Sequence, residues 1–327
     1  MKFTDSVHIV FSPHSLLFAI LLNLFVSVLS GCNFPAGEKY TIKMAFPAGQ
    51  YDMLQKTESS GSVVSMSQTF YKTLTVDKPA ENGTQKITLS ISRLTTTVTE
   101  PESYKKGESH KMVTKVFDTD APDTDTWPMK MQGAFVGAKV SLETDAQGKL
   151  GNVQGAAEFI ESVKNNPKYS KHAALITFDL QRQLSEEVLT NPFEQIRSLL
   201  PASPVAVGEK WKTEIEIDVP MLMKQKLESE NRFKKIKTEN GRKIAVITAK
   251  SVLHSDKPQQ VAPKNRLESM DFSAERVTEI DLGSGLILSS VLNIVTKATN
   301  TMDFGSQTTT QTGAMKIKVS LTLRPIK

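Results

Sequence analysis

One loop of the sequence concentrates acidic side chains that could bind a cation. Its four aspartates are Asp118, Asp120, Asp123 and Asp125. Calcium prefers several oxygen ligands from a flexible loop, so these residue types suit it. The loop lacks the central glycine and the distant glutamate of a helix-loop-helix calcium site. Two interpretations therefore stay open, a solvent-exposed acidic loop and a weak calcium site.

Basic side chains concentrate around a predicted hairpin that turns at Asn240-Gly241. The members of this basic patch are Lys234, Lys235, Lys237, Arg242 and Lys243. The patch could contact a partner or anionic lipid head groups, where each basic residue adds about 1 kcal/mol. A solvated sheet edge is the alternative, because lysine often protects such edges from aggregation. Nucleic-acid binding is not expected, since aromatic residues are not interleaved with the basic ones apart from Phe233.

Residues suited to catalysis are sparse. Beyond residue 31 the histidines are His110, His172 and His254, and none has a second histidine or a carboxylate at metal-ligand spacing. The sequence contains no Gly-rich phosphate loop, no Gly-x-Ser-x-Gly motif and no His-Glu-x-x-His motif. We expect no cofactor and no catalytic residue. A hydrolase whose acidic residues meet only in the fold is an alternative.

The one cysteine, Cys32, follows an uncharged apolar run from Leu16 to Val28. This length suits the core of a signal peptide, roughly 7–15 residues, better than a membrane span of about 20. Leu29-Ser30-Gly31-Cys32 resembles the bacterial lipobox. In that family the cysteine receives a diacylglyceryl group and the preceding peptide, here 1–31, is removed.

The lipobox resemblance implies a location. It places the chain on the extracytoplasmic side of a bacterial cell envelope, held to the membrane by lipid at Cys32. An uncleaved transmembrane anchor is the alternative. In lipoproteins an aspartate after the cysteine often marks inner-membrane retention, so Asn33 slightly favours the outer membrane. The net charge of +5 is mild and fits either anionic partners or an ordinary soluble surface.

Alternation of apolar and polar residues dominates the rest of the chain. Strands with one buried face are predicted over 40–46, 63–76, 87–98, 211–219, 244–253, 286–296 and 315–323. Several of these runs exceed the usual six residues, which indicates wide, curved antiparallel sheets. Trp211 shares a face with Ile215 and Ile217, so we expect its side chain to be mostly buried.

Helical spacing is confined to the middle of the sequence. Ala156, Phe159, Ile160 and Val163 follow the i, i+3, i+4, i+7 pattern, and Leu180, Leu184 and Val188 continue with that period. Asn191 is predicted to cap a further helix that has Pro192 at its first position. Pro201 and Pro204 end the helical block.

Three landmarks recur in the same order in both halves. They are Gly37-Glu38-Lys39-Tyr40 with Gly208-Glu209-Lys210-Trp211, Asn82-Gly83 with Asn240-Gly241, and Asp145-Ala146-Gln147-Gly148 with Asp281-Leu282-Gly283-Ser284-Gly285. Turns reuse Asn-Gly and Asp-Gly because these residues tolerate positive φ. The Gly-Glu-Lys-aromatic box is harder to explain in that way and favours an internal duplication.

Several of these features together resemble an uncharacterised family of secreted bacterial lipoproteins, classed as a domain of unknown function. They are the Gly-Glu-Lys-Trp box after Leu200-Pro201, the Asp-x-x-Gly turn before Leu150-Gly151-Asn152-Val153, and the turn from Asp281 to Gly285. The match would cover most of residues 37–324. The resemblance implies an extracytoplasmic β-rich lipoprotein and no catalytic activity.

The sequence therefore predicts a β-rich α+β fold, with two related antiparallel sheets or half-barrels joined by a central helical segment. The expected parts are a signal peptide (1–31), a first β-rich half (32–150), a helical connector (151–204) and a second β-rich half (205–327). The expected function is non-enzymatic binding of an envelope partner or ligand. A carrier of apolar ligands such as lipids is the first alternative, and an extracytoplasmic hydrolase is the second.

Overall fold

The computed structural model describes residues 37–61, 63–102, 111–121, 131–145, 148–219, 223–262, 264–303 and 308–326. The chain divides into two units, Met1–Lys39 and Tyr40–Lys327, and the second carries the fold below. Cys32, the run from Leu16 to Val28, His110, Asp123 and Asp125 lie outside the described residues. Among the helices that are described, none is both long and apolar enough to cross a membrane.

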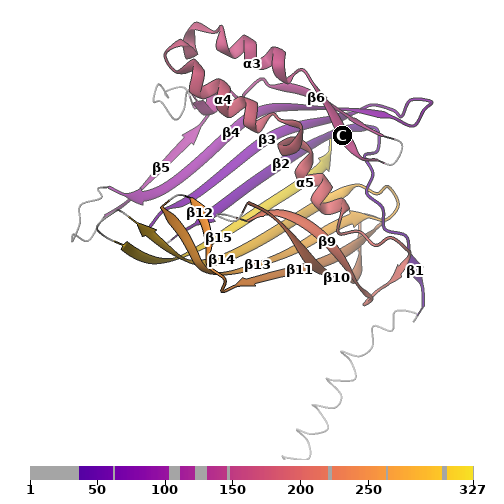
Figure 1. Cartoon of the computed structure of the whole chain (residues 1–327). Coiled ribbons are helices and arrows are strands. Elements are labelled where there is room, and N and C mark those ends of the chain that lie inside the picture. Colours follow the sequence, from indigo (N-terminus) through magenta and orange to yellow (C-terminus); the bar gives the residue numbers. More distant parts are fainter. Residues whose placement is uncertain are drawn as a thin grey trace, which may run out of the picture. The chain divides into compact units, whose positions relative to one another are not determined.

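One antiparallel sheet of 13 strands dominates the second unit (Figure 1). Its strands are β2 (Gly49–Ser60), β3 (Ser65–Val76), β4 (Gln85–Pro101), β5 (Met112–Asp118), β6 (Lys139–Thr144), β7 (Leu150–Gln154), β9 (Lys210–Val219), β10 (Met223–Glu239), β11 (Arg242–Ser255), β12 (Gln259–Ala262), β13 (Asn265–Asp281), β14 (Ile287–Asp303) and β15 (Thr308–Pro325). The main order is β7-β6-β4-β3-β2-β15-β14-β13-β11-β10-β9, with β5 beside β4 and β12 beside β13. Two short strands, β1 (Lys39–Tyr40) and β8 (Val205–Ala206), lie outside this sheet.

The prediction of two separate sheets or half-barrels is wrong. The last strand, β15, pairs with β2 in an unbroken register from Pro325↔Tyr51 to Lys316↔Ser60. Strands from both halves therefore lie side by side in the one sheet. This pairing satisfies backbone groups that would otherwise form an exposed edge on each half.

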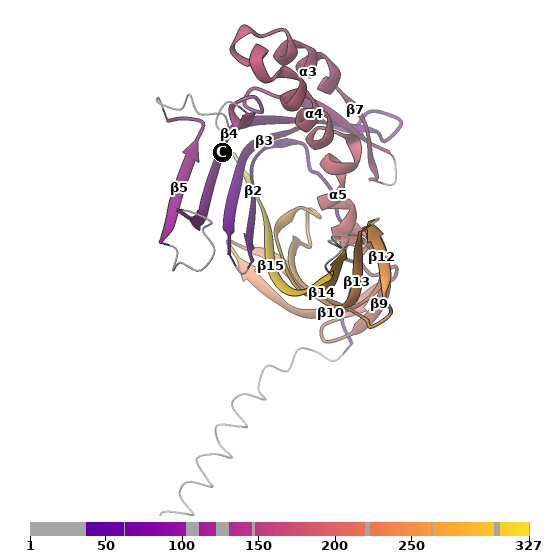
Figure 2. The same cartoon turned by 60° about the vertical axis from the view of Figure 1, so that its left-hand side comes forward.

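The expected alternation is confirmed along most strands, and it gives the sheet one buried face. In β3 and β4 the buried residues recur at every second position, as in Leu74 and Val76 or Ile87, Leu89 and Ile91. The sheet curves strongly, and its concave side carries the helices (Figure 2). Burying this face supplies most of the favourable free energy, at roughly 25 cal/mol for each Å² of apolar surface.

One predicted strand does not form. Residues 41–47 run extended without joining a ladder, although Ile42 and Phe46 are buried as the alternation predicts. The segment is instead held by the Ala45 amide, which donates a 2.9 Å hydrogen bond to the carbonyl of Gly285. Alternation here reports burial against the core and not strand pairing.

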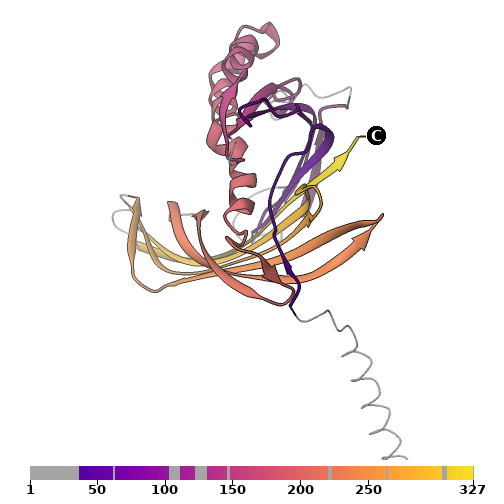
Figure 3. The same ribbon diagram turned by 90° about the vertical axis from the view of Figure 1, so that its right-hand side faces the viewer.

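The helices cross the concave side of the sheet (Figure 3). They are α3 (Ala156–Lys164), the 3₁₀ turn η1 (Pro167–His172), α4 (Ala173–Gln183) and α5 (Glu186–Arg197). Ile176 and Leu180 of α4, with Phe193 and Ile196 of α5, join the same hydrophobic cluster as the sheet residues. The helices and the sheet therefore share one core.

The predicted start of the last helix is wrong. Helix α5 begins at Glu186, and its cap is Ser185, whose hydroxyl accepts a 3.3 Å hydrogen bond from the Val188 amide. Pro192 lies inside this helix instead of at its first position. A proline that lacks an N–H leaves one helical hydrogen bond unmade, which weakens α5 near its middle.

The repeated landmarks lie at corresponding connections of the sheet. Asn82-Gly83 joins β3 to β4, and Asn240-Gly241 joins β10 to β11. Asp145 and Gly148 flank the connection from β6 to β7, while Asp281-Leu282-Gly283-Ser284-Gly285 joins β13 to β14. Both halves also progress in the same direction across the sheet. These positions agree with an internal duplication, which stays a prediction.

The turn at Gly285 allows a direct stability test against a matched turn. Gly285 and Gly241 both have φ of 76°, a region that L side chains rarely adopt. A Cβ at Gly285 would lie 2.9 Å from the Ala45 Cβ, whereas at Gly241 nothing lies within 4 Å. We expect Gly241→Ala to cost about 1 kcal/mol and Gly285→Ala about 2–4 kcal/mol, measured by urea unfolding. Equal losses would contradict the close approach of residue 45.

Candidate functional site

The most unusual side chain on the concave face is Lys72 of β3. Its cross-strand neighbours are Met53 on β2 and Ile91 on β4, and both are buried. Charged side chains are rarely placed among apolar ones unless they are paired. Lys72 therefore occupies a position where the sheet would ordinarily carry another apolar residue.

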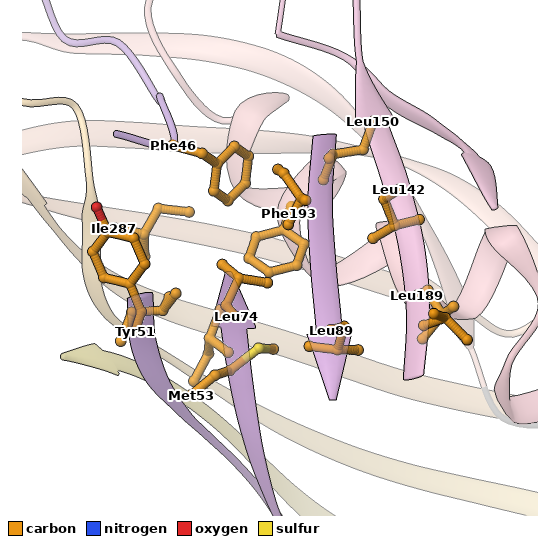
Figure 4. Close-up of a cluster of buried hydrophobic side chains, with 14 of the residues drawn as sticks. Phe46, Tyr51, Met53, Leu74, Leu89, Leu142, Leu150, Leu189, Phe193 and Ile287 are labelled. Carbon is orange, nitrogen blue, oxygen red and sulfur yellow. The ribbon is translucent and has the colours of Figure 1, made fainter. Parts of the chain in front are cut away.

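A small cavity of about 50 Å³ surrounds this lysine, between the sheet and the helices. Its apolar walls include Phe46, Met53, Leu74, Leu89, Leu142, Leu150, Leu189 and Phe193, shown with their neighbours in Figure 4. Leu184, Val188 and Pro192 close it from the helix side, and Gln183 adds one polar group. The walls come from β2, β3, β4, β6, β7, α4 and α5, so the site forms only when the whole core is assembled.

The ammonium group of Lys72 has polar contacts but no counter-charge among the residues that the structure describes. Its Nζ donates a 2.7 Å hydrogen bond to Oε1 of Gln55 and lies 5.0 Å from the centre of the Phe70 ring. Among the described residues no carboxylate forms an ion pair with it. Burial therefore disfavours the charged form and lowers the pKa of Lys72 to about 8 from 10.5. The side chain as a whole is only half-buried, which limits the energetic cost.

A second buried cation, Arg276 of β13, lies under α5. Its guanidinium donates to Oε1 of Gln195 at 2.6 Å and to Oγ of Ser290 at 3.3 Å. Burial lowers its pKa to about 10. No carboxylate in the described part of the chain pairs with it. The bond to Gln195 fixes α5 to the sheet, so this arginine has a clear structural role that Lys72 lacks.

The predicted acidic loop is only partly described. Asp118 pairs with Arg93 through both carboxylate oxygens, and Asp120 lies 3.2 Å from the same guanidinium. The hydrogen bonds from Arg93 lower the pKa of Asp118. Arg93 offsets part of the negative charge of these two carboxylates, and both interpretations of the loop stay predictions. Across the described residues, no group of three or more His, Cys, Asp or Glu side chains could hold a metal ion.

The predicted basic patch lies on the β10–β11 hairpin, and it is partly neutralised. Lys237 pairs with Glu279 at 2.8 Å and Glu239 at 2.9 Å, and these hydrogen bonds raise its pKa. Arg242 lies 3.8 Å from Asp281. The exposed side chains of the patch that pair with no described carboxylate are Lys234, Lys235 and Lys243. This end of β10 extends beyond β9, whose pairing ends at Lys210↔Arg232, and both interpretations of the patch stay predictions.

Two further sequence expectations can be compared with the structure. His254 does have a carboxylate neighbour, since its Nδ1 lies 2.6 Å from Oδ1 of Asp271 and this contact raises its pKa. The two residues face each other across β11 and β13, so sequence spacing could not show the contact. Trp211 packs against the main hydrophobic core with a smaller part of its surface exposed, which agrees with the expectation that it is mostly buried. Its indole N–H donates a 2.9 Å hydrogen bond to the carbonyl of Leu199.

The sequence did contain a signal for both buried cations. Lys72 is in phase with Phe70, Leu74 and Val76, which the alternation assigns to the buried face. Arg276 is likewise in phase with its buried neighbours Phe272, Ala274 and Ile280. A charged residue at an apolar position of a strand is therefore the pattern that would have found this site.

The sequence matches the model of one protein family. The model of a family of unknown function, DUF6263, matches residues 101–287, which is more than half of the chain. The chain belongs to this family. The match confirms the predicted resemblance to a domain of unknown function, over a shorter span than 37–324.

Comparisons with individual proteins add little. No curated protein matches the sequence significantly. Among solved structures, one described as "Lipid-protein interactions in lipovitellin" aligns with a TM-score of 0.40 and 10% sequence identity. The alignment covers 86% of this chain and 26% of the lipovitellin chain, so this chain spans about a quarter of that protein. A similarity this low supports no conclusion about function.

The cost of burying Lys72 predicts how stability depends on pH. Between pH 8 and 10.5 the unfolded chain keeps a proton on this residue that the folded chain has lost, so wild-type stability rises with pH. At pH 7 we expect Lys72→Met to stabilise the chain by about 1–3 kcal/mol, a gain that shrinks as the pH rises through this window. Urea unfolding from pH 7 to 10 measures it. The control is Lys86→Met, at an exposed lysine of β4. An equal gain in the free energy of unfolding for this variant would contradict the claim that burial destabilises charged Lys72.

Proposed function

We propose that the chain is a non-enzymatic binding protein whose ligand is an apolar molecule with an acidic group. The ligand would lie between the concave face of the sheet and helices α4 and α5. The observation that carries this proposal is Lys72, a lysine without a carboxylate partner among the described residues, set in an apolar cavity. An apolar pocket with one convergent polar group is the usual form of a small-molecule site.

The chemistry of the cavity supports this class of ligand. A hydrocarbon chain would contact the leucine and phenylalanine walls, and its burial is worth about 0.8 kcal/mol for each CH₂ group. An acidic head group would supply the counter-charge for the ammonium of Lys72. An opposite charge within about 4–6 Å favours the charged form, so binding would raise the pKa of Lys72 again. A ligand of this kind would therefore offset the free-energy cost of holding the charged Lys72 in an apolar cavity.

The cavity must enlarge before it can hold such a ligand. A volume of about 50 Å³ accepts no more than a water or two. Helices α4 and α5 are the walls best able to move, because the helical pattern breaks at Leu184-Ser185 and Pro192 weakens α5. Val188, which lines the cavity, is already 40% exposed. Movement of these helices would open the site towards solvent.

The location follows from the sequence and stays part of the proposal. A lipid on Cys32 would hold the protein at the extracytoplasmic face of a bacterial envelope, with the outer membrane favoured by Asn33. The basic patch is retained as a proposed contact with lipid head groups or an envelope partner. A carrier of amphipathic molecules in this compartment would bind its ligand close to a membrane.

The ligand proposal predicts a specific effect of Lys72. The full-length chain is purified, delipidated and titrated with palmitic acid or with the matching alcohol, hexadecanol. We expect the wild type to bind the acid about tenfold more tightly than the alcohol, since a buried charge pair contributes about 1–2 kcal/mol. Lys72→Met should remove this preference and leave alcohol binding unchanged, whereas Lys86→Met should behave as the wild type. Binding of neither molecule by the wild type would refute the proposed function.

The proposed anchor predicts lipid attachment at Cys32. Cells that express the chain are fed an alkyne fatty acid, and the purified protein is tested for the label. The wild type should carry the label and Cys32→Ser should not, because this is the one cysteine of the sequence. A mature protein that retains residues 1–31 would contradict the lipobox interpretation.

A further inference from the structure

Helix α4 has apolar residues on two opposite faces. Ile176 and Leu180 are buried in the core, while Leu175 and Phe178 on the other side are 60% and 66% exposed. A helix that packs on one side ordinarily has a polar outer face. The outer face of α4 therefore carries two large apolar side chains that no part of the described chain covers.

Basic residues lie near both ends of this apolar pair. Arg182 follows Phe178 by four residues on α4, so Leu175, Phe178 and Arg182 form one stripe of the helix, while Lys171 lies in the 3₁₀ turn η1 just before α4. Lys171 and Arg182 are exposed, as is Lys168 in the preceding 3₁₀ turn. Between residues 165 and 183 the single acidic residue is Asp179, which pairs with Arg182 at 3.0 Å. Within η1 and α4 the charged side chains near the apolar pair therefore carry a net positive charge.

We propose that this stripe of α4 docks onto an anionic lipid surface. Leu175 and Phe178 would enter the boundary between head groups and acyl chains, and the lysines would contact the head groups. Helix α4 has 11 residues, so it would lie on the membrane and not span it. A second copy of the chain fits less well, because its stripe would bring the same positive charges together.

Docking of α4 would bring the cavity close to the membrane. The docking proposal does not depend on the proposed ligand. The last residue of α4, Gln183, and the adjacent Leu184 line the cavity wall. A helix held in the head-group region would therefore bring one wall of the cavity to the lipid from which an amphipathic ligand could enter.

A local probe tests the docking without relying on how the rest of the chain reaches the membrane. Full-length Cys32→Ser carries a single new cysteine, either Phe178→Cys or Val252→Cys, labelled with the polarity-sensitive dye NBD. Val252 is the matched control, because it is 63% exposed but lies on strand β11. Circular dichroism checks that both variants fold. Each is mixed with vesicles of phosphatidylcholine, with or without phosphatidylglycerol.

The proposal expects a large difference between the two labels. With phosphatidylglycerol vesicles, the emission at position 178 should shift to the blue and rise several-fold, while the label at 252 stays as in buffer. Adding Lys168→Glu and Lys171→Glu should raise the vesicle concentration needed for the response at 178 by about thirtyfold or more. No shift at 178, or an equal shift at 252, would overturn the proposal. A blue shift at 178 that appears on raising the protein concentration without vesicles would also overturn the proposal, since it would indicate self-association.

Discussion

The structure depends above all on the pairing of β15 with β2. This register, from Pro325↔Tyr51 to Lys316↔Ser60, converts two groups of strands into a single antiparallel sheet. It also makes the concave face continuous, so that one hydrophobic cluster can include Tyr51 and Leu74 from the first half and Ile280 and Ile287 from the second. Helices α4 and α5 pack on that face and complete the cavity. Without this pairing both halves would expose an edge strand, and the helices would lose part of the surface on which they lie.

Two buried cations on this face illustrate different uses of charge. Arg276 donates hydrogen bonds to Gln195 and Ser290. The bond to Gln195 holds α5 against the sheet, so the buried guanidinium contributes to the structure. Lys72 donates to Gln55 and lies over the Phe70 ring, and neither contact neutralises its charge. A methionine of similar length would fill the same space without the desolvation cost. Under the proposed function, a ligand that supplies the counter-charge would explain why a lysine stands there.

The sequence predicts the strands well because alternation reflects burial, which is a local property of each segment. It fails where a different interaction satisfies the same pattern. The segment from Tyr40 to Phe46 alternates and is buried, yet it pairs with no strand over 41–47. The start of α5 was misplaced because Asn191-Pro192 also matches a helix start, whereas Ser185 caps the helix and Leu189, Thr190, Phe193 and Ile196 are buried along it. The pairing of β15 with β2 joins segments that are far apart in the chain, and nothing local encodes it. Lys72 could have been found, since its phase along β3 already marked it as inward-facing.

The most direct test of the account is the pKa of Lys72 itself, followed by NMR of its labelled side chain and assigned with Lys72→Arg. In the free, full-length protein the account predicts a pKa of about 8. Addition of palmitic acid should raise the pKa of Lys72 towards its ordinary range, whereas hexadecanol should leave it low or lower it further. An ordinary lysine pKa in the free protein, or no difference between the two molecules, would contradict the claim that this lysine awaits an acidic ligand.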